Sequence, residues 1–311
     1  MNSQVRGNRS KASGFTKNKT LFILTLPMLL YIFIFSYIPM VGTIVAFKRY
    51  DYQKGILGSD WIGLSNFKFF FTSPDSMSIT LNTIGYNTVF ILINLAASVF
   101  FAILLYEINS RFFLKFYQTA MFIPNLLSWV VVAYMAYAFL NPRSGMLNQW
   151  FAAMGKAPVD WYSAPGPWLF ILPLANLWKN LGSGILLYYA NLMGVDREYF
   201  EAAAVEGANK PQIIRYITLP FLYPLITMLT ILNIGHIFSA DFGLFFQLPM
   251  DSPMLYKTTD VLDTYVYRAL AQSGNIGMSS AASLYKSVVG FLLVVGSNYI
   301  VRRYNPENSL F

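Results

Sequence analysis

The sequence contains no cysteine and a single histidine, His236, and charged residues make up only 12% of its 311 residues. The absence of cysteine excludes disulfides, thiolate catalysis and cysteine-based zinc or iron–sulfur sites. One histidine is too few for a histidine-rich metal site, so we expect no metal in this chain. Soluble globular domains contain about 25% charged residues. The scarcity of charge, combined with a hydrophobic content of 56%, therefore argues against a soluble protein.

Long apolar runs dominate the chain instead. A bilayer core about 30 Å thick requires about 20 apolar residues in a helix, and in lipid a helix satisfies its backbone groups within its own segment. We therefore predict an all-α integral membrane protein, with residues 21–301 forming one domain of six transmembrane helices. The predicted spans are Leu21–Phe47, about Asn82–Ile108, about Phe116–Leu140, about Pro167–Met193, about Ile217–Leu248 and about Ala281–Val301.

Positive charge is distributed unevenly between the two sides of these spans. Residues 1–20 carry five Lys or Arg and no acidic residue, and the apolar run that follows exceeds the signal-peptide core of about 7–15 residues. The other segments on the same side are shorter, and denser in Lys and Arg, than the opposite loops. Because such segments remain in the cytoplasm, we expect tails 1–20 and 302–311 and loop 194–216 to be cytoplasmic. The net charge of +8 then reflects topology rather than nucleic-acid binding.

The loop between the fourth and fifth predicted spans has the pattern of two short helices joined by a turn. Residues 197–206 are rich in Glu and Ala, which favour helix, and Asp196 precedes them as a plausible N-cap. Gly207 is expected to stop this helix through a left-handed turn. Pro211 lies near the first turn of a second helix, which has an apolar stripe. A helix-turn-helix of this kind on the cytoplasmic side has a shape suited to a groove on a soluble protein.

Seven residues in and after this loop have a distinctive spacing. Glu-Ala-Ala is followed by three residues and Gly, and nine residues later by Ile-x-Leu-Pro. This pattern resembles the cytoplasmic signature of the permease subunits of ABC importers. The matching residues are Glu201, Ala202, Ala203, Gly207, Ile217, Leu219 and Pro220. The fragments Tyr37-Ile-Pro-Met, Trp61-Ile-Gly-Leu-Ser-Asn-Phe and Phe122-Ile-Pro-Asn resemble the maltose-type, binding-protein-dependent branch, which imports oligosaccharides and polysaccharide fragments.

The resemblance implies a role for the loop and a set of partners. It implies that the loop forms coupling helices in a groove of an ATP-binding subunit, where Glu201 contacts a basic residue and Gly207 sets the turn. It also implies a second, similar permease in a heterodimer, two ATP-binding subunits, an extracytoplasmic solute-binding protein and a carbohydrate substrate, in the cell membrane of a prokaryote. The chain has no G-x-x-x-x-G-K-[ST] motif. We therefore expect no cofactor in this chain, with ATP and magnesium bound by the partner ATPase.

Polar residues within the predicted spans are candidates for the substrate pathway, because such groups are costly in lipid and usually face a cavity or a neighbouring helix. Amides and hydroxyls suit the hydroxyl groups of sugars, and aromatic faces suit their rings. The candidates are Asn125, Asn176, Trp178, Asn180, Asn233, His236 and Asp241. Alternatively, these groups tie helices together, and Lys179 and Asp241 pair with each other or lie nearer an interface. Lys286 is expected to snorkel to the outer surface.

Three other functions each fit part of the sequence. An ion-driven secondary transporter accounts for six spans, and for Asp241 and His236 as a relay, but not for the loop motif. A membrane-embedded enzyme has little chemistry available, because the spans hold one histidine and no clustered carboxylates. A structural membrane scaffold predicts no coupling loop. We therefore predict a non-catalytic permease subunit that forms half of a translocation pathway.

Overall fold

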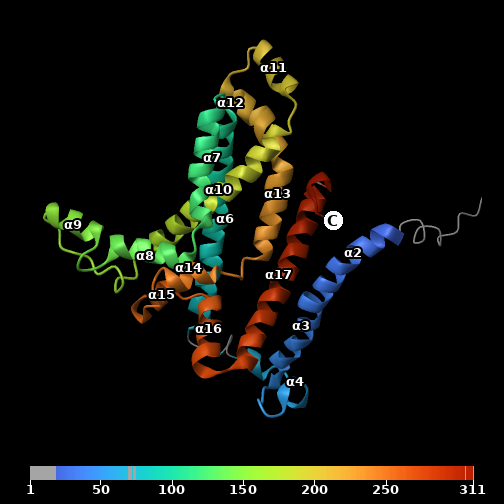
Figure 1. Cartoon of the computed structure of the whole chain (residues 1–311), viewed down its shortest axis with the longest axis vertical. Coiled ribbons are helices and arrows are strands. Elements are labelled where there is room, and N and C mark those ends of the chain that lie inside the picture. Colours follow the sequence, from blue (N-terminus) through green and yellow to red (C-terminus); the bar gives the residue numbers. More distant parts are fainter. Residues whose placement is uncertain (1–18, 69–71, 73–74, 305, 311) are drawn as a thin grey trace, which may run out of the picture.

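Helices make up most of the described part of the chain, which comprises residues 19–68, 72, 75–304 and 306–310 of this computed structural model (Figure 1). The predicted tail 1–20 lies outside the described residues, apart from its last two. The helices are α2 (Lys19–Ile32), α3 (Ile38–Met40), α4 (Gly55–Gly58), α6 (Ser76–Tyr106), α7 (Arg111–Leu126), α8 (Trp129–Leu140), α9 (Met146–Ala153), α10 (Trp168–Met193), α11 (Arg197–Val205), α12 (Lys210–Ile213), α13 (Leu219–Gly235), α14 (Phe242–Gln247), α15 (Tyr256–Thr259), α16 (Leu262–Ser273) and α17 (Ile276–Tyr304). Strands β1 (Lys48–Arg49) and β2 (Asp60–Trp61) pair antiparallel.

Four helical segments within the described residues are long and apolar enough to cross a membrane. They are Leu21–Phe47, Ser76–Tyr106, Lys210–Gly235 and Ile276–Tyr304, and α7 with α8 makes a fifth if the two are counted as one bent span. Helix α10 coincides with the predicted fourth span, yet its polar residues, among them Asn176 and Lys179, leave it outside this set. The structure therefore confirms an all-helical membrane architecture with four or five candidate spans.

The third predicted span, Phe116–Leu140, is wrong as a continuous helix. Helix α7 ends at Leu126, α8 begins at Trp129, and the two are bent by 97°. Pro124 weakens the last turn of α7, because proline has no N–H to donate. Ser128 then starts α8 as its N-cap, and its side chain accepts a hydrogen bond from the Val131 N–H at 3.3 Å. Helices α8 and α9 therefore leave the bundle sideways (Figure 1).

The fifth predicted span, Ile217–Leu248, is also wrong at its far end, because α13 stops at Gly235. The backbone turns at once, with the Ser239 N–H donating to the His236 carbonyl at 2.8 Å. Glycine is required where α13 meets α17, since a Cβ on Gly235 would lie 2.2 Å from Val294 Cγ2. A Cβ on Gly290 would lie 2.4 Å from the Gly235 carbonyl oxygen, so the two helices are in close backbone contact at this pair.

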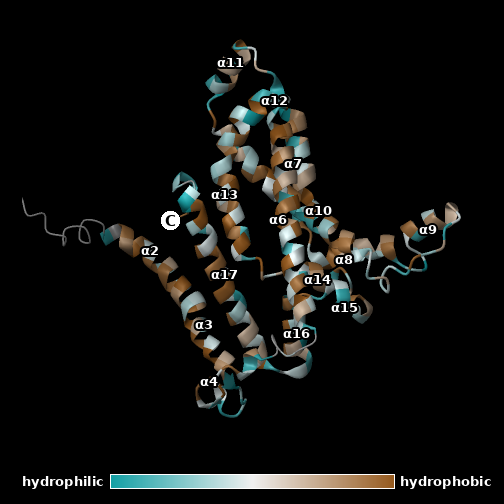
Figure 2. Ribbon diagram, turned by 180° about the vertical axis from the view of Figure 1, so that it is seen from behind, coloured by the Kyte–Doolittle hydropathy of each residue, from teal (hydrophilic) through white to brown (hydrophobic). Residues whose placement is uncertain are grey.

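The first span leans away from the other helices (Figure 1). It runs from α2 through a π-helical turn (Phe33–Tyr37) and α3 into a 3₁₀ segment (Val41–Phe47). Most of its apolar side chains are exposed in this chain alone, and the ribbon in Figure 2 is coloured mostly hydrophobic along it. In a membrane this surface is available to lipid or to another chain.

Helices α6, α7 and α10 form the tightest part of the bundle. A Cβ on Gly182 of α10 would lie 2.2 Å from the Met121 carbonyl oxygen of α7, so only glycine permits this approach. Around it lies a buried apolar cluster from α6, α10 and α13 that includes Leu105, Ile185 and Leu222.

Replacing Gly182 by alanine should separate α10 from α7. The added methyl group meets backbone rather than a flexible side chain, so we expect a loss of roughly 1–3 kcal/mol of stability. The matched control is Gly296→Ala in α17, where nothing lies within 4 Å of the added Cβ. Thermal melting of the purified protein in detergent, followed by circular dichroism, should show a lower melting temperature for Gly182→Ala alone. Equal melting temperatures for the two variants would contradict this packing.

Candidate functional site

Residues 194–216 form one tip of the molecule, where α11 and α12 lie beyond the ends of α6 and α7 (Figure 1). Helix α11 begins after Asp196 as predicted, although the Asp196 side chain makes no capping hydrogen bond. It ends in a Schellman motif, in which the Gly207 N–H donates to the Ala204 carbonyl at 3.1 Å and the Ala208 N–H to the Ala203 carbonyl at 3.0 Å. Gly207 has φ +82°, which confirms the predicted left-handed turn.

The second helix of the tip starts with a capping box. The Asn209 side chain accepts a hydrogen bond from the Gln212 N–H at 3.0 Å, and the Gln212 side chain accepts one from the Asn209 N–H at 2.8 Å. Pro211 lies in the first turn, as predicted. Helix α12 then passes through a π-helical turn (Ile214–Thr218) into α13. The motif residues Ile217, Leu219 and Pro220 therefore lie where the tip merges with α13.

Three contacts hold the tip to the bundle. Lys210 pairs with Glu107 just after α6, the Phe200 ring lies 5.4 Å from the Tyr106 ring, and the Tyr199 ring lies 5.4 Å from the Phe221 ring. Glu201 is exposed and has no ion-pair partner among the described residues. Of the adjacent motif residues, Ala202 is exposed and Ala203 is half-buried. The tip thus presents an uncovered acidic residue beside small side chains.

A cavity of about 440 Å³ lies between α6, α10 and the α13–α14 segment. Five of the seven predicted pathway residues line it, and these are Asn176, Asn180, Asn233, His236 and Asp241. Trp178 does not, because it is two residues from both Asn176 and Asn180 and therefore lies near the opposite side of α10. Asn125 does not line it either and contributes its backbone carbonyl to another site, described below.

The cavity also contains polar residues that sequence reasoning did not single out. Asn87, Asn94 and Ser98 of α6 are spaced seven and four residues apart, which places them on one helical face. This periodicity is the signal that would have identified them. Asn87 Nδ2 donates to the Ile237 carbonyl at 2.8 Å, and this bond ties α6 to the turn after α13.

Two asparagines form an amide pair in the cavity wall. Asn94 Nδ2 donates to Asn176 Oδ1 at 2.7 Å and to the Phe90 carbonyl at 2.8 Å. Asn94 Oδ1 is buried and accepts no hydrogen bond. The pair therefore leaves one acceptor beside the cavity that needs a donor.

Lys179 occupies the break between α7 and α8. Its Nζ donates to the Asn125 carbonyl at 3.0 Å and to the Leu127 carbonyl at 2.6 Å, and it lies 5.3 Å from the Trp129 ring centroid. Carbonyls at the end of a helix lack intrahelical donors, and a cation is favourable there. One alternative predicted that Lys179 and Asp241 pair with each other, and the structure shows no direct pair between them. Instead, Trp129 connects the two, because its Nε1 donates to Asp241 Oδ2 at 2.7 Å.

Lys286 does not snorkel outward as predicted. It pairs with Asp263 of α16, whose second carboxylate oxygen accepts a hydrogen bond from the Ala240 N–H at 2.7 Å. Lys286 lines a second cavity of about 420 Å³ between α13 and α17, which shares His236 and Ser239 with the first. The ion pair with Asp263 therefore holds the Lys286 side chain inside the protein instead of letting it extend to water.

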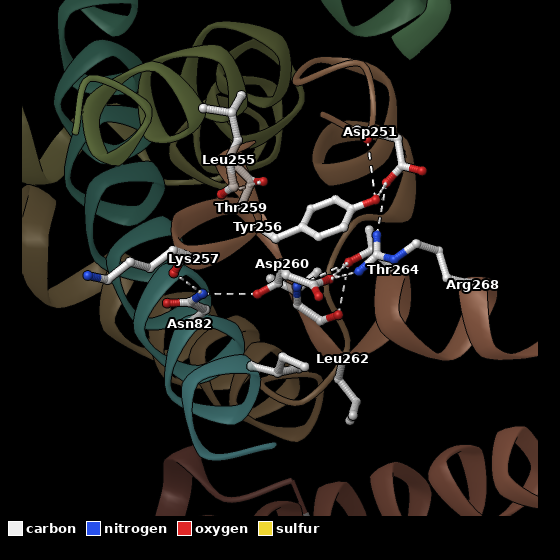
Figure 3. Close-up of polar contacts among 12 residues, drawn as sticks. Asn82, Asp251, Leu255, Tyr256, Lys257, Thr259, Asp260, Leu262, Thr264 and Arg268 are labelled. Atoms are coloured by element: carbon white, nitrogen blue, oxygen red, sulfur yellow. Dashed lines mark hydrogen bonds and ion pairs between the residues drawn. The ribbon is translucent and has the colours of Figure 1, made fainter. Parts of the chain in front are cut away.

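Arg268 organises a buried ionic cluster in the segment between α13 and α17 (Figure 3). Its two terminal nitrogens pair with Asp251 at 2.9 Å and with Asp260 at 2.5 Å, and its guanidinium lies 4.1 Å from the Tyr256 ring centroid. Asn82 of α6 donates to the Asp260 carbonyl at 3.0 Å and so fixes the cluster to the bundle. These bonds hold α15 and α16 against the end of α6.

Burial sets the protonation behaviour of this cluster. It raises the pKa of the Asp260 carboxyl, although the Thr264 hydroxyl and the Arg268 guanidinium act in the opposite direction. For Arg268, burial lowers the pKa, but Asp260, Tyr256 and Asp251 together outweigh that effect and the pKa rises above its ordinary value. Arg268 therefore remains charged, and the cluster serves as a structural tie.

Comparison with known proteins gives consistent similarities along the whole chain. Residues 94–306 match the profile of the family described as "Binding-protein-dependent transport system inner membrane component". The chain is 32% identical over 291 residues to Protein LplB of Bacillus subtilis, covering 94% of this chain and 91% of that protein. It is 30% identical over 297 residues to the polygalacturonan/rhamnogalacturonan transport system permease protein YteP of the same species, covering 94% and 90%.

Two solved structures are also similar. One is a bacterial ABC transporter involved in the import of the acidic polysaccharide alginate, with a TM-score of 0.84, 29% identity, and coverage of 94% of this chain and 98% of that chain. The other is a bacterial alginate ABC transporter in complex with an alginate pentasaccharide-bound periplasmic protein, with a TM-score of 0.83, 29% identity, and coverage of 94% and 97%. At this level of similarity the arrangement of helices is shared almost throughout.

Removing the amine of Lys179 should loosen the break between α7 and α8. Lys179→Met keeps the length and apolar stem of the side chain but leaves two carbonyls without their donor, each at a cost of roughly 1–3 kcal/mol. We expect a lower melting temperature in detergent. The control is Lys156→Met, at an exposed lysine outside the bundle. Melting of Lys179→Met together with the parent would show that other donors satisfy these carbonyls.

Proposed function

Because the chain belongs to the family of binding-protein-dependent transport system inner membrane components, we propose that it is the permease subunit of an ATP-driven carbohydrate importer and forms half of its translocation path. The observation that carries this proposal is the complete Glu-Ala-Ala…Gly…Ile-x-Leu-Pro pattern. Its Glu-Ala-Ala and Gly residues lie on the tip built by α11 and α12, and its Ile-x-Leu-Pro residues lie where the tip merges with α13. The relatives named for polygalacturonan/rhamnogalacturonan transport and for alginate import support carbohydrate as the substrate class.

The tip is the element proposed to couple ATP hydrolysis to transport. Glu201 is exposed and unpaired within the described residues, Ala202 and Ala203 allow close approach, and Gly207 fixes the angle between the two helices. These features suit a helical unit that enters a groove on an ATP-binding subunit. An ion-driven transporter has no use for such a tip, although Asp241 and His236 both line the cavity.

The proposed topology has six spans within residues 21–301, with the bent α7–α8 pair as the third and α10 as the fourth. Loop 194–216 and tails 1–20 and 302–311 are proposed to be cytoplasmic. The tip and the C-terminal end of α17 lie toward the same end of the molecule, which supports this assignment (Figure 1). The opposite end, with α4 and α16, then faces outward, in the cell membrane of a prokaryote.

The remaining partners are proposed from the resemblance to ABC importers. A second, similar permease completes the path as a heterodimer, two ATP-binding subunits bind ATP and magnesium, and an extracytoplasmic binding protein delivers the sugar. The alginate transporter solved with its periplasmic protein supports the last of these. The amide-lined cavity is proposed as this chain's part of the sugar path, because asparagine side chains both donate to and accept from hydroxyl groups.

The topology can be tested with single cysteines, since the natural chain has none. Val205→Cys at the tip should react with a membrane-impermeant maleimide only after cells are permeabilised. Met254→Cys, in the segment between the proposed fifth and sixth spans, should react in intact cells, and both native side chains are well exposed. Labelling of Val205→Cys in intact cells would place the tip outside and exclude a coupling role.

Two changes at the tip should uncouple transport. Glu201→Lys replaces an attraction by a repulsion at the proposed groove, and like-charge contact at an interface costs several kcal/mol. Gly207→Val forces a β-branched residue into the left-handed region. We expect uptake below about a tenth of the parent rate, because each 1.4 kcal/mol is about tenfold. The ATPase should dissociate, or hydrolyse ATP without transport.

The controls separate coupling from folding. Gly155→Val changes another glycine with positive φ, +68°, whose Cβ would also meet nothing within 4 Å, in the loop beyond α9. Glu201→Gln removes the charge without reversing it and should have a smaller effect than Glu201→Lys. Uptake and ATPase co-purification are measured at matched permease levels. Full uptake with a bound ATPase in both Glu201→Lys and Gly207→Val would remove the coupling role from this tip.

A further inference from the structure

The cavity between α6, α10 and the α13–α14 segment is polar, and His236 is the one basic side chain among its described lining residues. Among the described residues, no lysine or arginine lines it, and Asp241 is its single carboxylate. Five asparagines supply most of the polar surface, namely Asn87, Asn94, Asn176, Asn180 and Asn233. A carboxylate bound there would lose water without gaining a lysine or arginine as counter-charge, and Asp241 would repel it.

The two nearby lysines do not provide a free positive charge for this cavity. Lys179 is buried and donates to two carbonyls at the end of α7, away from the cavity lining. Lys286 lines the adjoining cavity between α13 and α17, but its charge is paired with Asp263. Lys179 and Lys286 therefore already bond to groups of the protein itself.

The Asn94–Asn176 amide pair leaves one oxygen that needs a hydrogen-bond donor. Asn94 Oδ1 is buried beside the cavity and accepts no hydrogen bond. Its assignment as the oxygen is supported by the other atom of the amide, Nδ2, which donates to two acceptors. Because this oxygen exposes almost no surface, a sugar hydroxyl reaches it only when the Asn94 side chain turns toward the cavity. A hydroxyl can then donate to it, whereas an ionised carboxylate can only accept.

We propose that the cavity wall contributed by this chain binds the uncharged, hydroxyl-bearing face of a carbohydrate and discriminates against uronates, with the Asn94–Asn176 pair as a hydroxyl-binding subsite. The proposal rests on the function proposed above and narrows its substrate class. The proposed substrate would then differ in charge from the acidic polysaccharide alginate, which is named for a similar solved structure. The proposal concerns this chain's half of the path alone.

The test compares matched sugars on the complete transporter. Thr230 lines the cavity and makes no part of the amide pair, so Thr230→Cys serves as the reporter in a chain that has no other cysteine. The labelling rate with N-ethylmaleimide is measured on the detergent-purified complex without binding protein. The probes are galactobiose against digalacturonate and mannobiose against dimannuronate, two pairs whose members differ only in oxidation at C6.

The neutral member of at least one pair should slow labelling at a concentration at least about tenfold below that of its uronate. Adding Asn94→Leu should abolish this protection. Thr88→Val on the same helix should preserve it, since Thr88 is exposed and bonds only to the Ile84 carbonyl. Adding Asn180→Lys should shift the preference toward the uronate, because it supplies the missing cation.

Three results would overturn the proposal. Equal or better protection by the uronates would refute the discrimination and leave the importer function standing. Undiminished protection in Asn94→Leu would remove the subsite. Protection by neither member of either pair would remove the cavity from the sugar path, and the tip variants at Glu201 and Gly207 then decide separately whether the coupling role survives.

Discussion

The arrangement of the cavity depends on one buried cation. A helix that ends within a membrane protein exposes carbonyls that lipid cannot satisfy, and Lys179 of α10 supplies donors to two of them at the end of α7. The bend that this permits brings the Trp129 ring beneath the ammonium group. Trp129 in turn donates to Asp241, whose other oxygen caps α14 through the Leu244 N–H at 3.2 Å. A chain of contacts from α10 thereby fixes the segment that closes the cavity.

The need to satisfy buried polar groups also accounts for the other charged residues in this part of the molecule. Lys286 is matched by Asp263, and Arg268 by Asp251 and Asp260. Charges far from water are stable only when paired or hydrogen-bonded. With these three cations bonded to structural partners, the described lining of the cavity consists mainly of neutral amides and hydroxyls, together with His236 and Asp241. The amide character of the cavity and the ion pairs around it are thus two consequences of one constraint.

Local features were predictable from the sequence, and features that depend on distant partners were not. The turn at Gly207 and the helix start at Asn209 and Pro211 follow from neighbouring residues, because caps and left-handed turns are made within a few positions. The breaks after Leu126 and Gly235 interrupt apolar runs that look continuous, since the donor for the first is Lys179, far along the chain. We predicted Trp178 as a pathway residue because of its side-chain chemistry, but its position around α10 turns it away from the cavity. Asn94 lies on the cavity-facing side of α6, and the sequence analysis did not select it.

The tip and the cavity are joined by a single run of helix. From Lys210 to Gly235 the chain is continuous through α12, the π-helical turn and α13, and 26 residues at 1.5 Å each span about 39 Å. Asn233 lies near its last residues and His236 follows immediately, so both cavity residues are attached to the end opposite the tip. If α11 and α12 couple to an ATP-binding subunit as proposed, their displacement would be transmitted to the cavity along this continuous helix. The close contact of Gly235 with Gly290 packs the cavity end of that helix against α17.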